Sequence, residues 1–294
     1  MKKFVLFFLV SLLFTTYSCK PTDKDLLKSG LAKYNLKDYK GAISEYNKAM
    51  KISLNYADIY RYRADAKYKL KDYQGAIHDY NKTIEINPNS AEAYYGRGII
   101  ESEISKNNQY ALNDFTTAIK IRPNYPEAYY LRGWCKYLLS DVKGAIYDFT
   151  KAIIIKPNYS RAYNMRGFMK SNFLLDFPKK FKGIEEQLEY EQKEMYKNNI
   201  AALADYNKAI EFDPKDADSY FSRGDIKTDL KDDRGAILDF NKSIEIWPKY
   251  ADAYIKRGFS KYRLGKKDSA CIDFSKAGEL GSERAYEVIK HYCK

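Results

Sequence analysis

The residue types that most often do chemistry are few or scattered in this chain. His78 and His291 are the only histidines, and neither belongs to an HExxH motif or to a Cys/His cluster of the kind that holds zinc. No glycine-rich phosphate loop and no GxSxG nucleophile motif occurs. We therefore expect no catalytic site, no metal site and no cofactor, and a protein that is not an enzyme.

One set of charged residues is regular along the chain. Six arginines are each followed by an aspartate on the next predicted helix. The pairs are Arg63 with Asp79, Arg97 with Asp114, Arg132 with Asp148, Arg166 with Asp205, Arg223 with Asp239 and Arg257 with Asp273. Because a planar guanidinium matches a carboxylate with two hydrogen bonds, we interpret the set as structural pairs between neighbouring helices. The alternative is a row of arginines that binds an acidic ligand.

These residues recur because the chain repeats itself about every 34 residues. In residues 126–159, two segments with apolar residues at helix spacing are separated by Ser140 and Asp141, which suit a turn and a helix N-cap. Gly133 lies inside the first segment, where glycine costs about 1 kcal/mol relative to alanine. We therefore expect a second backbone to approach it closely, with Ala145 as the small partner.

The order aromatic, Gly, aromatic, Ala, aromatic, Ala, Pro over 34 residues resembles the tetratricopeptide repeat. With Pro126 counted as position 1, every repeat has Ala at position 20 and an aromatic residue at position 24. The resemblance covers residues 23–282. It implies an all-α fold, a right-handed superhelical solenoid of about seven helix–turn–helix repeats with a C-terminal capping helix. Since each repeat packs only on its neighbours, we expect one elongated domain.

The repeat boundaries follow from this numbering. The expected repeats are residues 23–56, 57–90, 91–125, 126–159, 160–216, 217–250 and 251–282, followed by a capping helix at 283–294. The fifth repeat contains an insertion at residues 176–199. We expect its second helix to begin early and to project from the stack.

The N-terminus has the features of an exported protein. Residues 1–18 carry two lysines, a short apolar run and a polar end, as secretory signal peptides do. Ser18 followed by Cys19 resembles the lipobox of bacterial lipoproteins. The resemblance implies a lipidated Cys19, a short tether at residues 19–22, and a location in the cell envelope, with the outer membrane favoured. The alternative is ordinary cleavage, which leaves a periplasmic or secreted protein.

Three further cysteines follow. Cys135 lies on the inner face of its repeat, so we expect a buried thiol. Cys271 and Cys293 lie 10 and 12 residues on either side of Gly281, where two helices are expected to turn back on each other. Because export permits oxidation, these two predict a disulfide, and the alternative is a pair of buried thiols.

In tetratricopeptide arrays, the first helix of each repeat lines a concave groove, so the resemblance implies that this groove is the binding surface. Aromatic residues and arginine are common anchors of protein interfaces. The candidate aromatic residues are Tyr68, Tyr95, Tyr130, Trp134, Tyr137, Phe168, Phe221, Phe259 and Tyr262. Charged residues at the same positions include Arg161, Asp225 and Arg263. The alternative for each ring is packing between helices.

Composition narrows the function classes. A chain that is 16% aromatic and 45% hydrophobic is not disordered. Its net charge of +12 favours anionic surfaces, although export argues against nucleic acid. We expect a non-enzymatic scaffold or adaptor on the bacterial cell envelope that holds a protein or peptide partner in its groove. The alternative is a glycan-binding or anionic-polymer-binding module, with envelope polysaccharide as the ligand.

Overall fold

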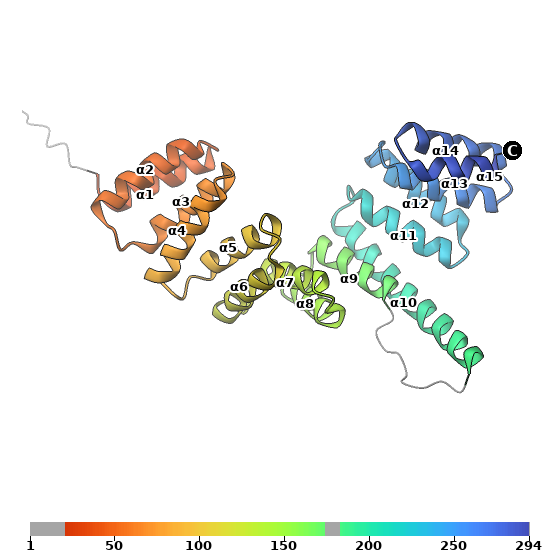
Figure 1. Ribbon diagram of the computed structural model, residues 1–294, viewed down its shortest axis with the longest axis horizontal. Helices are drawn as coiled ribbons and strands as arrows, with labels where there is room; N and C mark the ends of the chain where they lie inside the picture. The colour runs from red at the N-terminus through yellow and green to blue at the C-terminus, as the bar shows by residue number, and fades with distance from the viewer. Residues whose placement is uncertain (1–20, 174–182, 294) are drawn as a thin grey trace, which may run out of the picture. The chain divides into compact units, whose positions relative to one another are not determined.

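The computed structural model describes residues 21–173 and 183–293, and every regular element in them is an α-helix (Figure 1). The predicted class, all-α with helix–turn–helix repeats, is confirmed. These residues fall into two compact units that divide between Pro88 and Asn89. The sequence predicts one continuous domain instead, because the repeats before and after this point keep the regular pattern.

The first unit contains two helical pairs. Its helices are α1 (Asp23–Asn35), α2 (Tyr39–Ile52), α3 (Ala57–Lys69) and α4 (Tyr73–Ile86). Helix α1 packs on α2 and α3 packs on α4, while α2 also contacts α3. The unit therefore has the alternating contacts expected of two stacked repeats.

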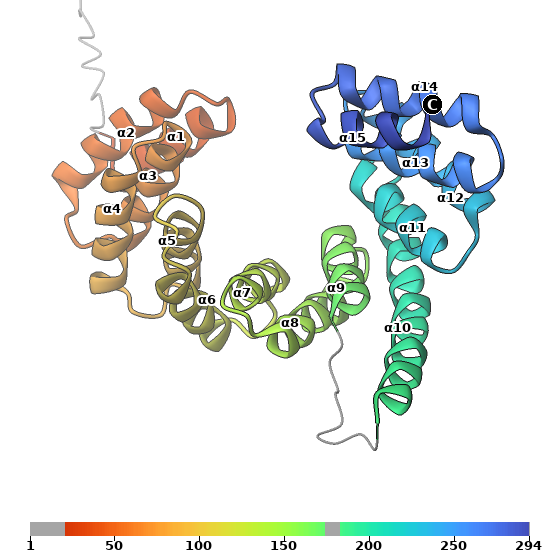
Figure 2. The same cartoon turned by 45° about the vertical axis from the view of Figure 1, so that its right-hand side comes forward.

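The second unit continues the alternation over five pairs and a final helix (Figure 2). From α5 to α15, each helix packs on the next one along the chain. The helices are α5 (Ala91–Glu103), α6 (Asn108–Ile121), α7 (Pro126–Leu138), α8 (Val142–Ile155), α9 (Ser160–Asn172), α10 (Ile184–Phe212), α11 (Ala217–Asp229), α12 (Asp233–Ile246), α13 (Ala251–Arg263), α14 (Lys267–Glu279) and α15 (Glu283–Tyr292).

Short turns join the helices of most repeats, and four of these turns use the same chemistry. In the fourth repeat Ser140 has a φ of 66°, and the Asp141 carboxylate accepts a hydrogen bond from the Gly144 backbone N–H at 2.9 Å. This confirms the N-cap predicted for α8. Equivalent carboxylates begin three other second helices, namely Asp38, Asp72 and Asp232. A capped helix start satisfies a backbone donor that has no partner inside the helix.

The two helices of a repeat approach each other closely at position 8. A Cβ atom on Gly133 would lie 3.0 Å from the Phe149 ring and 3.2 Å from the Ala145 carbonyl oxygen. The close approach predicted for Gly133 and Ala145 is therefore confirmed. The aromatic side chain at position 24 fills the space between the helices and is at most 3% exposed in every repeat. These residues are Tyr46, Tyr80, Phe115, Phe149, Tyr206, Phe240 and Phe274.

The fifth repeat departs from the pattern in its second helix. Helix α10 has 29 residues, whereas the second helices of the other repeats have 13 or 14. It begins at Ile184, well before Asn199, where a regular second helix would start. In Figures 1 and 2 its N-terminal half extends beyond the helices beside it. This confirms the early start predicted for the insertion, of which residues 176–182 lie outside the described part of the chain.

The predicted signal peptide at residues 1–18 and the predicted lipidation site at Cys19 also lie outside the described residues. Among the helices at 21–173 and 183–293, none combines the length and the apolar character needed to cross a membrane.

Candidate binding groove

The first helices of the third, fourth and fifth repeats line a hollow of about 580 Å³ in the second unit. Much of its lining is apolar: Ile99 comes from α5, and Leu131, Trp134 and Leu138 come from α7. Glu103, Lys106 and Arg161 of α9 add charged groups to the lining. We call this the apolar hollow. Its shape and lining suit a hydrophobic side chain with polar groups beside it.

A second hollow of about 480 Å³ adjoins the first, and the two share Tyr130, Trp134 and Arg161. Three aspartates and one lysine from the turn before α11 and its first residues complete the lining: Asp213, Lys215, Asp216 and Asp218. We call this the acidic hollow. Its carboxylates outnumber its cations, so it favours a hydrogen-bond donor or a positively charged group.

Ring packing holds the shared wall in place. The Tyr130 ring centroid lies 5.7 Å from that of Phe149 and 5.3 Å from that of Tyr159. Burial raises the pKa of Tyr130, so its hydroxyl stays protonated at neutral pH. Trp134 packs its indole against Tyr137, with the ring centroids 5.7 Å apart. Trp134 thus packs on the Tyr137 ring and also lines both hollows.

A hydrogen-bond network holds Asn164 and Asp216, two residues that line the acidic hollow. The Asp216 carboxylate accepts from the Ser219 hydroxyl at 2.5 Å and from the Asn164 side-chain amide at 3.4 Å. The same amide donates to Ser219 Oγ at 2.7 Å. Asp216 also accepts from the Asp218 backbone N–H at the start of α11. These contacts join α9 to α11 and fix the acidic side of the hollow.

The predicted Arg–Asp pairs are confirmed in all six repeats. In each pair the arginine Nε and Nη2 donate to the two carboxylate oxygens at 2.6–3.0 Å. In the fourth repeat the Asp148 side chain is fully buried and Arg132 is largely buried. These contacts support the structural interpretation, since the guanidinium donors that would bind an acidic ligand already face a carboxylate.

A lysine adds to most of these pairs, and the prediction missed it. It lies four residues after the arginine and contacts the same aspartate at 2.7–2.9 Å. These lysines are Lys67, Lys136, Lys170, Lys227 and Lys261. The third repeat has Glu101 at this position. The regular spacing of the lysines was visible in the sequence and could have revealed the contact.

Family models match four segments of the chain. Two models described as tetratricopeptide repeat match residues 26–56 and 107–160, and one described as TPR repeat matches residues 64–100 and 198–230. The chain is a tetratricopeptide repeat protein. A search of curated proteins finds no match to it.

Solved structures share the fold of this tetratricopeptide protein at low identity. A tetratricopeptide repeat protein from Parabacteroides merdae ATCC 43184 is 19% identical, with a TM-score of 0.58 over 92% of this chain and 99% of that one. YrrB, described as a TPR protein with an unusual peptide-binding site, is 21% identical, with a TM-score of 0.53 over 71% and 95%. PilF of Pseudomonas aeruginosa is 14% identical, with a TM-score of 0.62 over 79% and 96%.

Of the candidate aromatic residues, the structure brings Tyr130 and Trp134 together in the two hollows of the tetratricopeptide array. Tyr68 belongs to the first unit, where it packs on Tyr73. The other candidates contact neighbouring rings: Tyr95 on Tyr125, Tyr137 on Phe168, Phe221 on Tyr250, Phe259 on Phe274 and Tyr262 on Tyr292. These contacts agree with packing between helices, the alternative given above, although Tyr262 is still 38% exposed.

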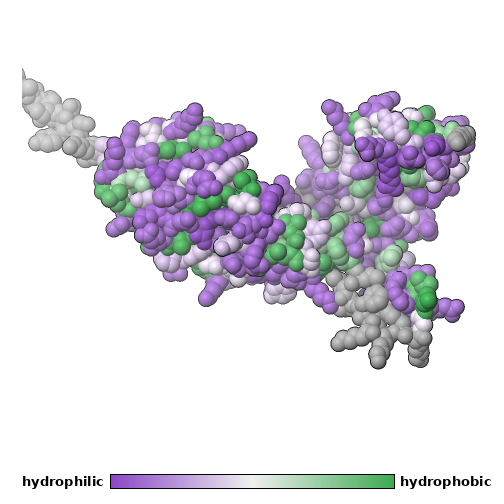
Figure 3. Space-filling view, in the orientation of Figure 1, coloured by the Kyte–Doolittle hydropathy of each residue, from purple (hydrophilic) through white to green (hydrophobic). Residues whose placement is uncertain are grey.

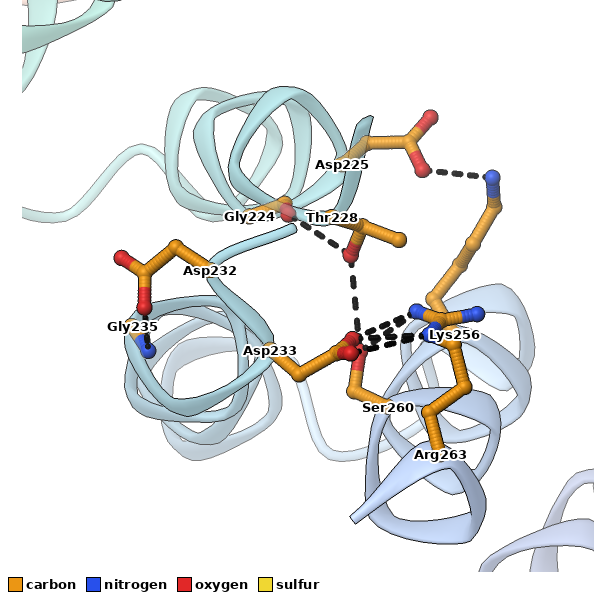
Figure 4. Close-up of polar contacts among 9 residues, drawn as sticks. All are labelled: Gly224, Asp225, Thr228, Asp232, Asp233, Gly235, Lys256, Ser260 and Arg263. Atoms are coloured by element: carbon orange, nitrogen blue, oxygen red, sulfur yellow. Dashed lines mark hydrogen bonds and ion pairs between the residues drawn. The ribbon is translucent and has the colours of Figure 1, made fainter. Parts of the chain in front are cut away.

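Of the charged candidates, one lines the two hollows and two form ion pairs between repeats. Arg161 is exposed and lines both hollows. Toward the C-terminal end, neighbouring repeats pair their charges (Figure 4). There Asp225 contacts Lys256 at 2.5 Å, and the Arg263 guanidinium donates to both carboxylate oxygens of Asp233. Asp225 and Arg263 thus join successive repeats.

The three described cysteines occupy two environments. Cys271 and Cys293 are joined by a disulfide, which ties α14 to the residue after α15. Cys135 is a buried free thiol whose Sγ lies 3.6 Å from the Ser102 hydroxyl. Burial raises the pKa of the Cys135 thiol, so the reactive thiolate form is suppressed.

Proposed function

We propose that this protein is a non-enzymatic scaffold that binds a partner protein segment in the groove formed by the apolar and acidic hollows. The observation that carries the proposal is the placement of Trp134 between two hollows that share Tyr130 and Arg161. Trp, Tyr and Arg are the residues most often found at binding hot spots, the few positions that carry most of the binding energy of an interface. The peptide-binding site named for YrrB, a protein of the same fold, also supports the proposal.

The two hollows define the chemistry of the segment. An apolar side chain fills the hollow lined by Ile99, Leu131 and Leu138. A neighbouring donor or basic side chain enters the acidic hollow and faces Asp213 and Asp218. The preferred segment therefore carries an apolar residue close to a basic one.

We further propose that the protein acts on the bacterial cell envelope, held to the membrane by a lipid on Cys19 and favouring the outer membrane. The support is the sequence of residues 1–19. The disulfide between Cys271 and Cys293 agrees with an oxidising compartment. If Cys19→Ala left the protein in the membrane fraction, the anchor would be refuted, and release into the soluble fraction would support it.

Photocrosslinking in cells tests the groove. Benzoylphenylalanine replaces Trp134, and a matched control replaces Tyr147, an exposed ring on α8 that lines neither hollow. We expect a specific protein adduct from position 134 and none of it from position 147. The same adducts from both positions would contradict the proposal.

A second candidate function is binding of a glycan or anionic polymer, which the net charge of +12 and the exposed Arg161 favour. Retention of the protein on cell-wall polysaccharide, reduced by Trp134→Ala and by salt, would support this candidate. Roughly 1 M salt is enough, because it screens exposed charges that are more than about 3 Å apart. Recovery of a protein adduct from position 134, with no retention on polysaccharide, would exclude it.

A further inference from the structure

The inner stripe of α10 continues beyond the repeats. Within the fifth repeat, the stripe contains the buried residues Ala202 and Tyr206. Steps of seven residues lead back from Ala202 to Met195 and Leu188, and a step of four leads to Ile184, so all lie on one face of the helix. Met195 and Leu188 are each 49% exposed, and Ile184 is 77% exposed. Figure 3 shows apolar surface near the free end of α10.

A hollow of about 680 Å³ lies where this stripe enters the repeats. Met195, Tyr196 and Asn199 of α10 line one side, and Asp229, Lys231 and Arg263 line the other. We call it the basal hollow. It is separate from the apolar and acidic hollows, with which it shares no lining residue.

Asn199 marks the basal hollow as a place for a hydrogen-bond donor. Its side chain is only 3% exposed, and its Oδ1 accepts no hydrogen bond from the residues that the structure describes. A buried acceptor without a donor is unfavourable, and a donor entering the hollow would relieve this. Asp229 supplies a carboxylate in the same hollow, and its pKa is raised by partial burial and by Asp225.

The part of α10 before the regular repeat, residues 184–198, is the α10 extension, and its charge indicates the charge of the partner. Residues 184–198 contain five Glu and two Lys, a net charge of −3 in a chain of net charge +12. Glu191 lies three residues after Leu188 and four before Met195, so it shares the side of the helix that carries the stripe. Lys193 and Lys197 lie on the opposite side. The apolar stripe is therefore bordered by negative charge.

We propose that the α10 extension and the basal hollow dock a basic amphipathic helix of a partner protein. The apolar face of that helix covers Leu188 and Met195. A neutral hydrogen-bond donor at its edge enters the basal hollow and donates to Asn199 Oδ1, since Lys231 and Arg263 already face Asp229 there. The basic residues of that helix lie along the acidic extension, beside Glu191. A helix fits because apolar residues at helix spacing pack best against the ridges of another helix, as they do elsewhere in this unit. The site is a second interaction surface, independent of the groove proposed above.

The test uses the full chain and a fluorescent Leu/Lys peptide of about 15 residues, which as a helix is as long as the extension, about 22 Å. The apolar residues of this peptide have helix spacing. A scrambled peptide of the same composition tests the spacing, and a Leu/Glu peptide of the same pattern tests the charge. Fluorescence anisotropy measures the dissociation constants. We expect saturable binding of the helical Leu/Lys peptide and at least tenfold weaker binding of the other two.

Paired variants locate the site. Leu188→Gln with Met195→Gln should weaken binding at least tenfold. Ile200→Gln should change it less than twofold, because Ile200 is equally exposed, at 46%, but lies off the stripe. All of these variants also carry Trp134→Ala, because the groove too favours an apolar residue beside a basic one, so the binding that remains belongs to the α10 site. Circular dichroism checks that each variant keeps its helix content.

Four outcomes would overturn the proposal. The first is no saturable binding of the Leu/Lys peptide, and the second is equal binding of the Leu/Glu peptide. The third is a dimer of this chain that the double variant abolishes, which would make a second copy the occupant. The fourth is slower thiol labelling of a Met195→Cys variant than of an Ile200→Cys variant in the free protein, which would show that the stripe is already covered.

Discussion

Asp148→Asn tests whether the charged residues of the repeats hold the fold together. The Asp148 carboxylate is fully buried and accepts from Arg132 at 2.7 and 2.8 Å, while Lys136 Nζ lies 2.8 Å away. Removing one partner from a buried ion pair costs about 3–5 kcal/mol, because the remaining charge stays desolvated. Asparagine keeps one acceptor oxygen for Arg132. We therefore expect the free energy of unfolding to fall by about 3 kcal/mol, the lower end of this range.

The third repeat provides a matched comparison. Asp114 accepts from Arg97 with the same geometry, but Glu101 replaces the lysine. Asp114→Asn therefore removes a negative charge that pairs with an arginine alone. Asp148→Asn removes one that pairs with both an arginine and a lysine. We expect a loss of about 1.5–2 kcal/mol, the lower range for hydrogen bonds to charged groups.

Urea unfolding followed by circular dichroism, with the disulfide kept oxidised, measures both losses. Equal losses for the two variants would refute the role assigned to the lysine. A loss below about 1 kcal/mol for Asp148→Asn, a value typical of exposed pairs, would refute the buried-pair argument itself. If Arg132→Ala instead weakened partner binding and left stability unchanged, the arginines would form a ligand-binding row.

Three further measurements test other parts of the fold. A Cβ on Gly258 would overlap the buried ring at position 24, so Gly258→Ala should lower the free energy of unfolding by about 2–3 kcal/mol. Gly133 has more space, and the better helix propensity of alanine offsets about 1 kcal/mol there, so Gly133→Ala should be close to neutral in the same urea experiment. Breaking the disulfide with Cys271→Ser should cost about 3 kcal/mol for a loop closed over 22 residues to Cys293, measured by thermal melting against the oxidised protein. Because Cys135 is buried and its pKa is raised, its thiol should react with Ellman's reagent much more slowly in the native chain than in urea; similar rates would contradict its burial.

The repeat geometry could be predicted because each feature depends on short sequence distances. Gly133 and Ala145 lie on two helices joined by a tight turn, so their spacing determines which residues face each other. The same holds for Arg132 and Asp148. The division at Pro88 could not be predicted in this way, because it does not interrupt the regular sequence pattern.

The groove was harder to predict because exposure depends on the neighbouring repeat. Trp134 and Asp225 occupy the same repeat position. Trp134 lines two hollows, whereas Asp225 is drawn into an ion pair with Lys256 of the next repeat. The position of a residue within its repeat therefore predicts that it could line the groove. Whether it does depends on the side chains of the adjacent repeat.

The α10 extension shows why helix length matters as much as helix pattern. Helix α10 has 29 residues and is about 44 Å long, whereas α9 and α11 have 13 residues each and are about 20 Å long. Helices of that length cannot cover the whole inner face of α10, so part of it must extend past them. If the part of α10 that extends past α9 and α11 were polar, it would simply be a solvated helix. Leu188 and Met195 instead continue the apolar stripe of the packed half and are half exposed among the described residues. Such an exposed apolar stripe is typical of a docking surface.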